Sequence, residues 1–178
     1  EWHDNPHAWV KLWKHHAAQD QADRLNSIAR KRGEQWLKYY GGKISSEWLF
    51  PKLMQIAEEA PDVYAAMDDF IEATDWLTWQ LTGKKIKNAT TAGYKAIWNA
   101  ETGFPSNEFF KELNPLMENV IEDKIGTKFY PVGTKAGGLL EKVAKATGLN
   151  VGIAVGVGNV DAHVSVAPTG VVKPRTML

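Results

Sequence analysis

The chain has 178 residues, of which 44% are hydrophobic and 24% charged, so a soluble globular domain with a core of its own is expected. Lysine and arginine together number 21, as do aspartate and glutamate, and this balance argues against a nucleic-acid or anionic-membrane surface. Cysteine is absent, which excludes disulfides and cysteine-based zinc sites and weakly favours the cytoplasm.

The first third of the chain predicts a strand followed by two helices. The apolar run at residues 8–13 favours a buried strand. Downstream, apolar residues recur every three to four positions and stop before Gly33, where a helix is expected to end. Ser45 or Ser46 can cap a second amphipathic helix, which Pro61 ends.

The middle third predicts short alternating elements. A short helix, a brief strand and a longer helix are expected at residues 62–67, 70–73 and 74–81. Thr74 or Asp75 is the expected cap of the longer helix, and Gly83 closes it. The Thr-, Tyr- and Trp-rich stretch at residues 90–99 predicts a strand. A turn at residues 103–106 then leads into another helix, which is expected to run up to Leu113.

The last third predicts a loop, a helix and a group of strands. The loop and helix are expected at residues 130–138 and 139–147, with Gly148 as the helix stop. Continuous apolar character at residues 151–157 predicts a buried parallel strand. Strict alternation of apolar residues at residues 160–166 favours another strand, and a further strand is expected from Val171 onward. The interleaving of helices and strands along the chain indicates an α/β fold. Because the strands are few, unpaired sheet edges and exposed apolar surface are expected.

The strongest chemical signal is a glycine-rich turn that leads from an apolar strand to Asp161. Ligands of open α/β sheets lie beyond the carboxyl ends of strands, where a carboxylate could accept a proton from a substrate hydroxyl. The spacing is not a dinucleotide fingerprint, because Asp161 stands where the third glycine belongs, and no phosphate-loop Gly-Lys-Ser/Thr follows. On the residues alone, a tight turn with a solvated aspartate is the simpler interpretation.

Aromatic residues suggest a second possible site. Eight tryptophans are unusual for this length, and most are expected to fill the core. Trp13 is the best candidate for stacking against a sugar, and Lys95 could hydrogen-bond a substrate hydroxyl, although a lone lysine is usually solvated. The histidines near the start of the chain lack an acidic partner at metal-binding spacing, so they are expected to be surface residues: His3, His7, His15 and His16.

Five motifs occur in one order. They are LWKHHAA, GKISSEW with PKL, FIEATDWL with LTG, GYKA and VDAH, at residues 12–18, 42–53, 70–83, 93–96 and 160–163. Each is weak alone, but together they resemble the FGGY family of carbohydrate kinases, closest to its ribulokinase members.

The resemblance implies a partial actin-like, ribonuclease-H-like domain. Residues 1–178 would form part of the N-terminal, sugar-binding domain of an FGGY kinase, without the nucleotide-binding C-terminal domain. Asp161 matches the general base and would begin a helix, whose dipole should favour the ionised carboxylate. Trp13 and Lys95 match sugar contacts, and we expect them to lie near Asp161. Proximity alone is implied for Lys14, His15, His16 and Ala162, and no residue matches an ATP contact.

The implied activity is that of a cytoplasmic sugar kinase. The parent enzyme would use ATP and Mg²⁺ to convert ribulose to ribulose 5-phosphate in arabinose catabolism, and this chain alone would be an inactive fragment. Its partner would be a small-molecule sugar, with no nucleic acid or membrane, and the parent enzyme could be a homo-oligomer. The alternatives are a xylulokinase or other pentulose kinase and, in another class, a non-catalytic sugar-binding or regulatory module.

Overall fold

The computed structural model describes residues 2–176, and the chain divides into two compact units. Unit 1 comprises Glu1–Phe70 and Lys95–Thr127, and unit 2 comprises Ile71–Tyr94 and Lys128–Leu178. No helix within residues 2–176 is long and apolar enough to cross a bilayer.

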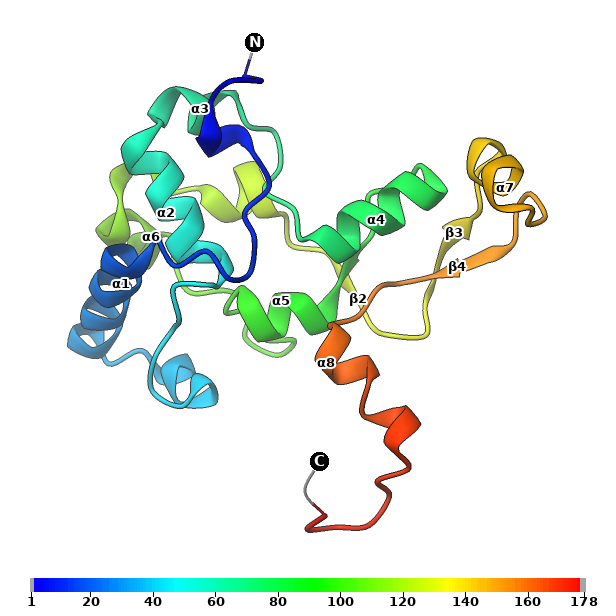
Figure 1. The fold of residues 1–178 in the computed structure, drawn as a ribbon. Coiled ribbons are helices and arrows are strands. Elements are labelled where there is room, and N and C mark those ends of the chain that lie inside the picture. The colour runs from blue at the N-terminus through cyan, green and yellow to red at the C-terminus, as the bar shows by residue number, and fades with distance from the viewer. Residues whose placement is uncertain (1, 177–178) are drawn as a thin grey trace. The chain divides into compact units, whose positions relative to one another are not determined.

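Unit 1 is built from helices. Figure 1 shows α1, α2 and α6 packed side by side. The helices are α1 (Gln19–Arg32), α2 (Leu49–Glu59), α3 (Pro61–Ala66) and α6 (Asn107–Leu113). Short 3₁₀ helices lie at Pro6–Ala8, Gln35–Tyr40 and Pro115–Met117, and a π-helical turn lies at Ile121–Ile125.

Aromatic rings form much of the core of unit 1. Phe50 on α2 and Phe110 on α6 are fully buried, with ring centroids 4.8 Å apart. Phe109, the residue before Phe110 on α6, meets the ring of Trp36 edge to face at 5.5 Å. Ser106 caps α6 by accepting a hydrogen bond from the Phe109 backbone N–H. This cap and the burial of both rings fix α6 against its neighbours.

A buried asparagine holds the loop between α1 and α2. Asn26 on α1 donates from its side-chain Nδ2 to the Ile44 carbonyl oxygen at 2.8 Å and accepts from the Ile44 N–H at 2.7 Å. The amide thus satisfies both backbone groups of Ile44, as a neighbouring strand would. The loop can therefore be buried without joining a sheet.

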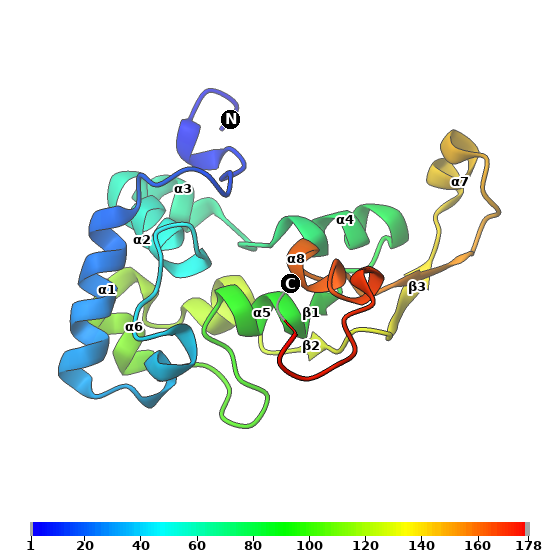
Figure 2. The same cartoon turned by 60° about the horizontal axis from the view of Figure 1, so that its bottom comes forward.

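Unit 2 contains two small sheets with helices (Figure 2). Strands β1 (Lys87–Asn88) and β2 (Phe129–Tyr130) pair in parallel, and β3 (Lys135–Gly138) and β4 (Ala154–Gly156) pair antiparallel. The helices are α4 (Ala73–Thr82), α5 (Ala89–Lys95), α7 (Glu141–Thr147) and α8 (Asp161–Val164), with a 3₁₀ helix at Ala167–Thr169. Helix α5 ends at the residue where the chain passes into unit 1.

The loop before α8 packs closely against the first turn of α4. A Cβ atom built on Gly158 would overlap the Oγ1 atom of Thr74, so the loop can approach α4 only because residue 158 has no side chain. Val157 and Val160 on either side of the close approach are buried. The Val157 N–H also donates to the Thr134 carbonyl oxygen at 2.9 Å. This packing fixes the backbone that leads into Asp161.

The α/β class and most helices match the sequence predictions. Helices α1, α4 and α7 end at Gly33, Gly83 and Gly148, which adopt left-handed φ angles of 69°, 73° and 73°. Helix α8 begins at Asp161, as the family resemblance implied, so the strand suggested by alternation at residues 160–166 is wrong.

The strand predicted at residues 8–13 is wrong. Trp9 and Val10 are 58% and 83% exposed, and the segment pairs with no strand of the described chain. Its backbone hydrogen bonds are local. The Ala8 N–H donates to the Asn5 carbonyl oxygen, and the His15 N–H donates to that of Leu12. Apolar composition alone therefore misled the prediction, because it could not separate a buried strand from an exposed irregular segment.

The predicted strands at residues 70–73 and 90–99 are also wrong. The first stretch is irregular and runs into α4 at Ala73. In the second, residues 90–95 belong to α5, because the side-chain oxygen of Asn88 accepts hydrogen bonds from the Thr91 N–H and Oγ1 at 2.6 and 2.7 Å, which starts a helix. The expected serine and Thr74/Asp75 caps are not used, since Trp48 and Glu72 occupy the N-cap positions of α2 and α4.

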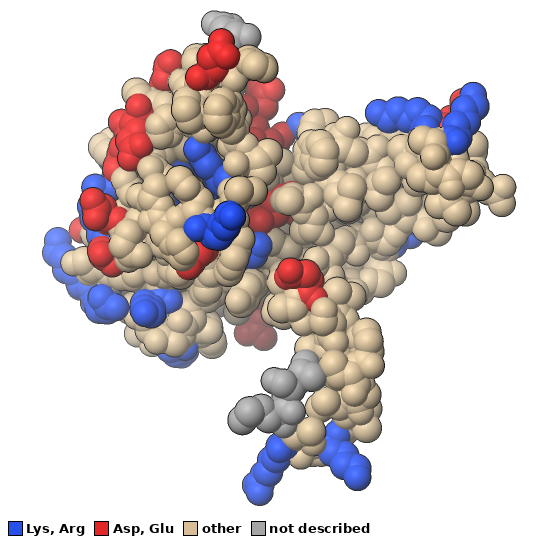
Figure 3. All heavy atoms as spheres, in the orientation of Figure 1, with Lys and Arg blue, Asp and Glu red and all other residues tan. Residues whose placement is uncertain are grey.

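The strands expected near the end of the chain differ from those observed. Within residues 151–157 only β4 is a strand, and it pairs antiparallel with β3, which lies in the predicted loop 130–138. Val151 and Ile153 are 63% and 40% exposed, so this is not a buried parallel strand. Residues 171–176 form no strand. The expected exposed apolar surface is present, and Figure 3 shows few charged atoms on the viewed face over α4, β3 and β4.

A buried carboxylate links α4 to the start of α5. Asp75 is 4% exposed, and its Oδ1 accepts hydrogen bonds from the Asn88 backbone N–H and Nδ2 at 2.9 and 2.7 Å. Desolvation by burial raises the pKa of Asp75 from 3.8 to about 6, although the hydrogen bonds from Asn88 oppose this rise. The Asn88 side chain in turn binds Thr91, so one network orders three successive elements.

This network predicts a pH-dependent stability. Because the folded-state pKa of Asp75 is raised, its stabilising contribution is complete below about pH 4 and is lost as the pH rises through about 6. Each pKa unit corresponds to about 1.4 kcal/mol, so the change should be roughly 2–3 kcal/mol. Asp75→Asn keeps the accepting oxygen and removes the titration. Urea denaturation of the full-length protein should show the wild type losing stability relative to this variant between pH 4 and 7.

Exposed Asp20, on the first turn of α1, supplies the control. Between pH 4 and 7 the loss of stability relative to Asp75→Asn should exceed any change relative to Asp20→Asn. A difference between wild type and Asp75→Asn that is independent of pH would show that the Asp75 carboxyl does not titrate as described.

Candidate functional site

Trp13 and Lys95 lie together in unit 1 although they are far apart in the sequence. The Lys95 Nζ lies 4.8 Å from the centroid of the Trp13 ring, in cation–π geometry. Trp13 is 51% exposed and Lys95 is half-buried, so both present surface to solvent. An indole ring can stack on the C–H face of a sugar, and an ammonium group can donate to its hydroxyls. The pair that the sequence suggested as sugar contacts is therefore assembled.

The turn that carries Trp13 is held by a buried lysine. The Leu12 carbonyl oxygen accepts from the His15 N–H at 3.1 Å, which closes a turn with Trp13 and Lys14 at its centre. The same oxygen accepts from the Nζ of Lys52 at 2.8 Å. Lys52 belongs to α2 and is 5% exposed. The turn is thus bonded to the helical core of unit 1.

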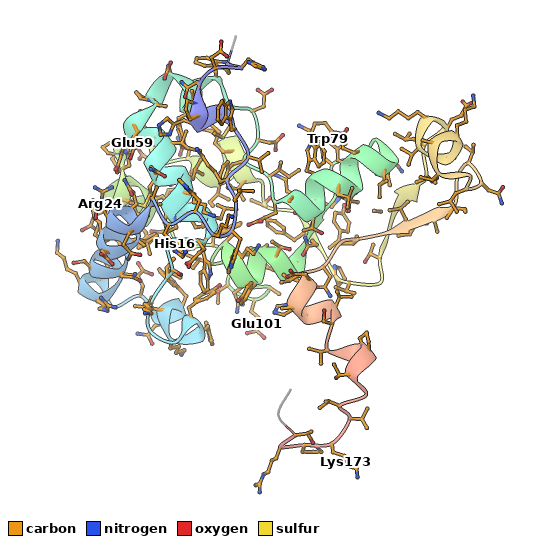
Figure 4. The ribbon with its side chains drawn as sticks, in the orientation of Figure 1. His16, Arg24, Glu59, Trp79, Glu101 and Lys173 are labelled. Atoms are coloured by element: carbon orange, nitrogen blue, oxygen red, sulfur yellow. The ribbon has the colours of Figure 1, made fainter. Side chains whose placement is uncertain are left out.

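The histidines near this turn do not gather into a metal site. The Nδ1 of His16, labelled in Figure 4, lies 3.1 Å from Glu47 Oε1, and the Nε2 of His7 lies 3.4 Å from Glu59 Oε2. Within residues 2–176 no group of three histidine, aspartate or glutamate side chains could hold a metal ion.

Backbone strain lies two residues after Lys95. Ile97 has a φ of 56°, in the left-handed region that β-branched residues rarely adopt, and it is 2% exposed. Such a conformation costs about 1–2 kcal/mol. The burial of Ala96 and Ile97 side by side holds the chain in this conformation. It redirects the chain immediately after the lysine, and strained residues of this kind are concentrated at functional sites.

Asp161 is the first residue of α8 in unit 2. Its side chain is exposed, and its Oδ1 accepts a hydrogen bond from the Ala162 N–H at 2.8 Å. The helix has four residues, so its macrodipole is weak. Next to it, the ring of His163 meets Tyr94 edge to face at 5.1 Å. An exposed carboxylate on a fixed loop is available to bind a hydroxyl and take up its proton.

The predicted site residues therefore fall into two groups. Trp13 and Lys95 meet in unit 1, together with the neighbouring Lys14, His15 and His16 of the same segment. Asp161 and Ala162 belong to unit 2, and their approach to the Trp13–Lys95 pair stays a prediction.

Two residues that support these groups were missed as site candidates. Lys52 appeared in the sequence analysis only as part of a motif, yet it lies three residues after Leu49 and four before Ile56, both on the buried face of α2. A lysine at a core position of an amphipathic helix is the signal that could have found it. Asp75 was expected only as one of two alternative caps of α4, and no comparable signal marks its role.

Comparisons with known proteins identify the family to which this chain belongs. Residues 2–167 match the N-terminal domain of the FGGY family of carbohydrate kinases. Over 178 residues the chain is 58% identical to a ribulokinase of Halalkalibacterium halodurans and 51% identical to one of Mycolicibacterium smegmatis. These alignments cover 100% of this chain but 32% and 31% of the relatives. The chain thus spans about a third of the length of the curated relatives.

A solved structure shares the fold. The crystal structure of a xyloylose kinase from Brucella ovis superposes with a TM-score of 0.60 at 19% identity, covering 83% of this chain and 28% of that protein. The family match spans nearly all of the sequence, and it includes the turn of Trp13, the helix of Lys95 and the loop of Asp161. The chain belongs to the FGGY family of carbohydrate kinases.

Proposed function

We propose that the full-length protein phosphorylates ribulose at its terminal hydroxyl, with ATP as phosphoryl donor and Mg²⁺ as its companion ion. The observation that carries this proposal is the 58% identity, over the whole chain, to a protein named ribulokinase. The Trp13–Lys95 pair supports it, since it offers the ring and donor that a sugar needs. Residues 1–178 would belong to the sugar-binding domain, and the contacts to the nucleotide and metal would lie outside them.

The residues of this chain would bind the sugar and move one proton. Trp13 would stack against the sugar, and Lys95 would donate to one of its hydroxyls. Asp161 would accept the proton of the attacking hydroxyl as its oxygen bonds to the γ-phosphorus of ATP and the bond to the β–γ bridging oxygen breaks. ADP would leave with that oxygen, and ribulose 5-phosphate would be the product. Positioning and proton removal are what this reaction requires of a sugar site.

The proposal is tested by the turnover of the full-length protein with ATP, Mg²⁺ and a panel of pentuloses. ADP release should be fastest with ribulose, measured as kcat/KM. A preference for xylulose would favour another pentulose kinase of the family. Sugar binding without ADP release would favour a non-catalytic sugar-binding module.

The role of Asp161 predicts a loss of turnover without a loss of fold. Asp161→Asn is nearly isosteric and keeps an oxygen for the Ala162 N–H, but it cannot take up the hydroxyl proton. A general base contributes about 10²–10⁴-fold in rate, so kcat should fall by that order while KM for ribulose changes little. Steady-state kinetics and a thermal melt on the same preparation measure both effects.

Exposed Asp62 on the first turn of α3 provides a matched control. Asp62→Asn should leave kcat and the melt unchanged. Near-normal turnover in a folded Asp161→Asn variant would remove Asp161 from the mechanism, and a collapsed melt would show that it serves to hold the loop.

The role of Lys95 predicts weaker sugar binding. Lys95→Met removes a charge-assisted hydrogen bond, typically about 1.5–3 kcal/mol, so ribulose should bind roughly 10- to 100-fold more weakly. Isothermal titration with ribulose measures this directly. Lys85 is a close control, because its Nζ lies 4.7 Å from the ring of Trp79 on α4, in the same type of contact. Equal weakening by Lys85→Met and Lys95→Met would contradict a specific sugar contact.

A further inference from the structure

Lys52 is an ionisable group on the buried side of α2. Its neighbours along the inward side of α2 are fully or nearly fully buried, among them Leu49, Leu53 and Ile56. Removing an ammonium group from water is costly, and buried charges can often be replaced by apolar residues of similar size without loss of stability. Packing therefore gives no reason for a lysine at this position. The reason has to lie in what its Nζ contacts.

The Nζ contacts the backbone of the segment that carries Trp13. It donates to the Leu12 carbonyl oxygen, one residue before the tryptophan. Leu12 and Trp13 are themselves 58% and 51% exposed, so apolar burial does little to hold them. The other lysine bond in this segment is local, from Lys11 Nζ to the Pro6 carbonyl oxygen at 3.0 Å. Lys52 thus connects the core of unit 1, by a hydrogen bond, to the turn that carries the Trp13 ring.

The position of the ring matters because Lys95 lies over it. The ring centroid and the Lys95 Nζ are 4.8 Å apart, and a sugar that contacts both the ring and the ammonium group needs both at fixed places. Movement of the turn by about 1 Å would separate the two contacts without unfolding any helix. The chain of contacts from Lys52 through Leu12 to Trp13 lies wholly within unit 1.

We propose that Lys52 is a positioning residue for sugar binding, which holds Trp13 in place through the Leu12 carbonyl and does not itself touch the sugar. This rests on the proposed function, in which Trp13 and Lys95 bind ribulose. The role requires that removing the Lys52 ammonium group weaken sugar affinity, that it leave the chemical step nearly intact, and that its effect depend on the presence of the Trp13 ring.

The test is a double-mutant cycle in the full-length protein. Lys52→Met is similar in length and apolar, so it should fold. We expect KM for ribulose to rise on the order of 10-fold, with kcat and KM for ATP little changed. In a Trp13→Ala background the same Lys52→Met change should add less than twofold, because the ring that it positions is gone. Lys11→Met, which removes the local hydrogen bond from lysine to the Pro6 carbonyl oxygen, should change neither kcat nor KM for ribulose.

Several outcomes would overturn the positioning role. They are an unchanged KM in Lys52→Met, a fall in kcat at constant KM, or full additivity with Trp13→Ala. If Lys52→Met does not fold, Lys52→Leu, which also removes the donor, is run through the same cycle with the same expectations. If the wild type rejects ribulose but accepts another pentulose, the proposed function fails and the cycle is measured with that sugar. If it binds no pentulose, both proposals fail.

Discussion

Hydrogen bonds from buried polar side chains to backbone atoms hold the irregular segments of this chain. Lys52 binds the Leu12 carbonyl, Asn26 binds both backbone groups of Ile44, and Asp75 binds the Asn88 N–H. The paired strands are two to four residues long, so they supply few ladder hydrogen bonds. Buried backbone groups must nevertheless be satisfied. Polar side chains fixed on helices fulfil that requirement, and they place the loops that carry the candidate site.

This arrangement suits the proposed chemistry. A sugar offers many weak contacts, so its recognition depends on a few groups held at fixed positions. The ring of Trp13 and the ammonium group of Lys95 come from irregular or helix-terminal backbone, yet each is attached to buried structure, through Lys52 on one side and Ala96 and Ile97 on the other. The carboxylate of Asp161 likewise follows a loop anchored by buried valines. Exposed reactive groups on fixed backbone are what phosphoryl transfer to a hydroxyl requires.

The sequence predicted the helices better than the strands, for physical reasons. Apolar spacing and glycine stops located α1, α4 and α7, because helix ends depend on local backbone geometry. Strands depend on distant partners, so the apolar run at residues 8–13 and the threonine-rich run at residues 90–99 were misassigned. Trp13, Lys95 and Asp161 were found through the order of five family motifs. On residue type alone each was ambiguous, and Lys52 was overlooked because a single lysine in a helix is usually solvated.

The contact between Gly158 and Thr74 limits how these two positions can change over evolution. Any side chain at position 158 would collide with the Thr74 hydroxyl, whereas loss of that hydroxyl would leave the threonine Cβ position at an ordinary contact distance of 3.4 Å. A Cβ at position 158 therefore requires that the Thr74 hydroxyl turn away, that position 74 lose the hydroxyl, or that the loop next to Asp161 shift. Substitutions at the two sites should consequently affect one another.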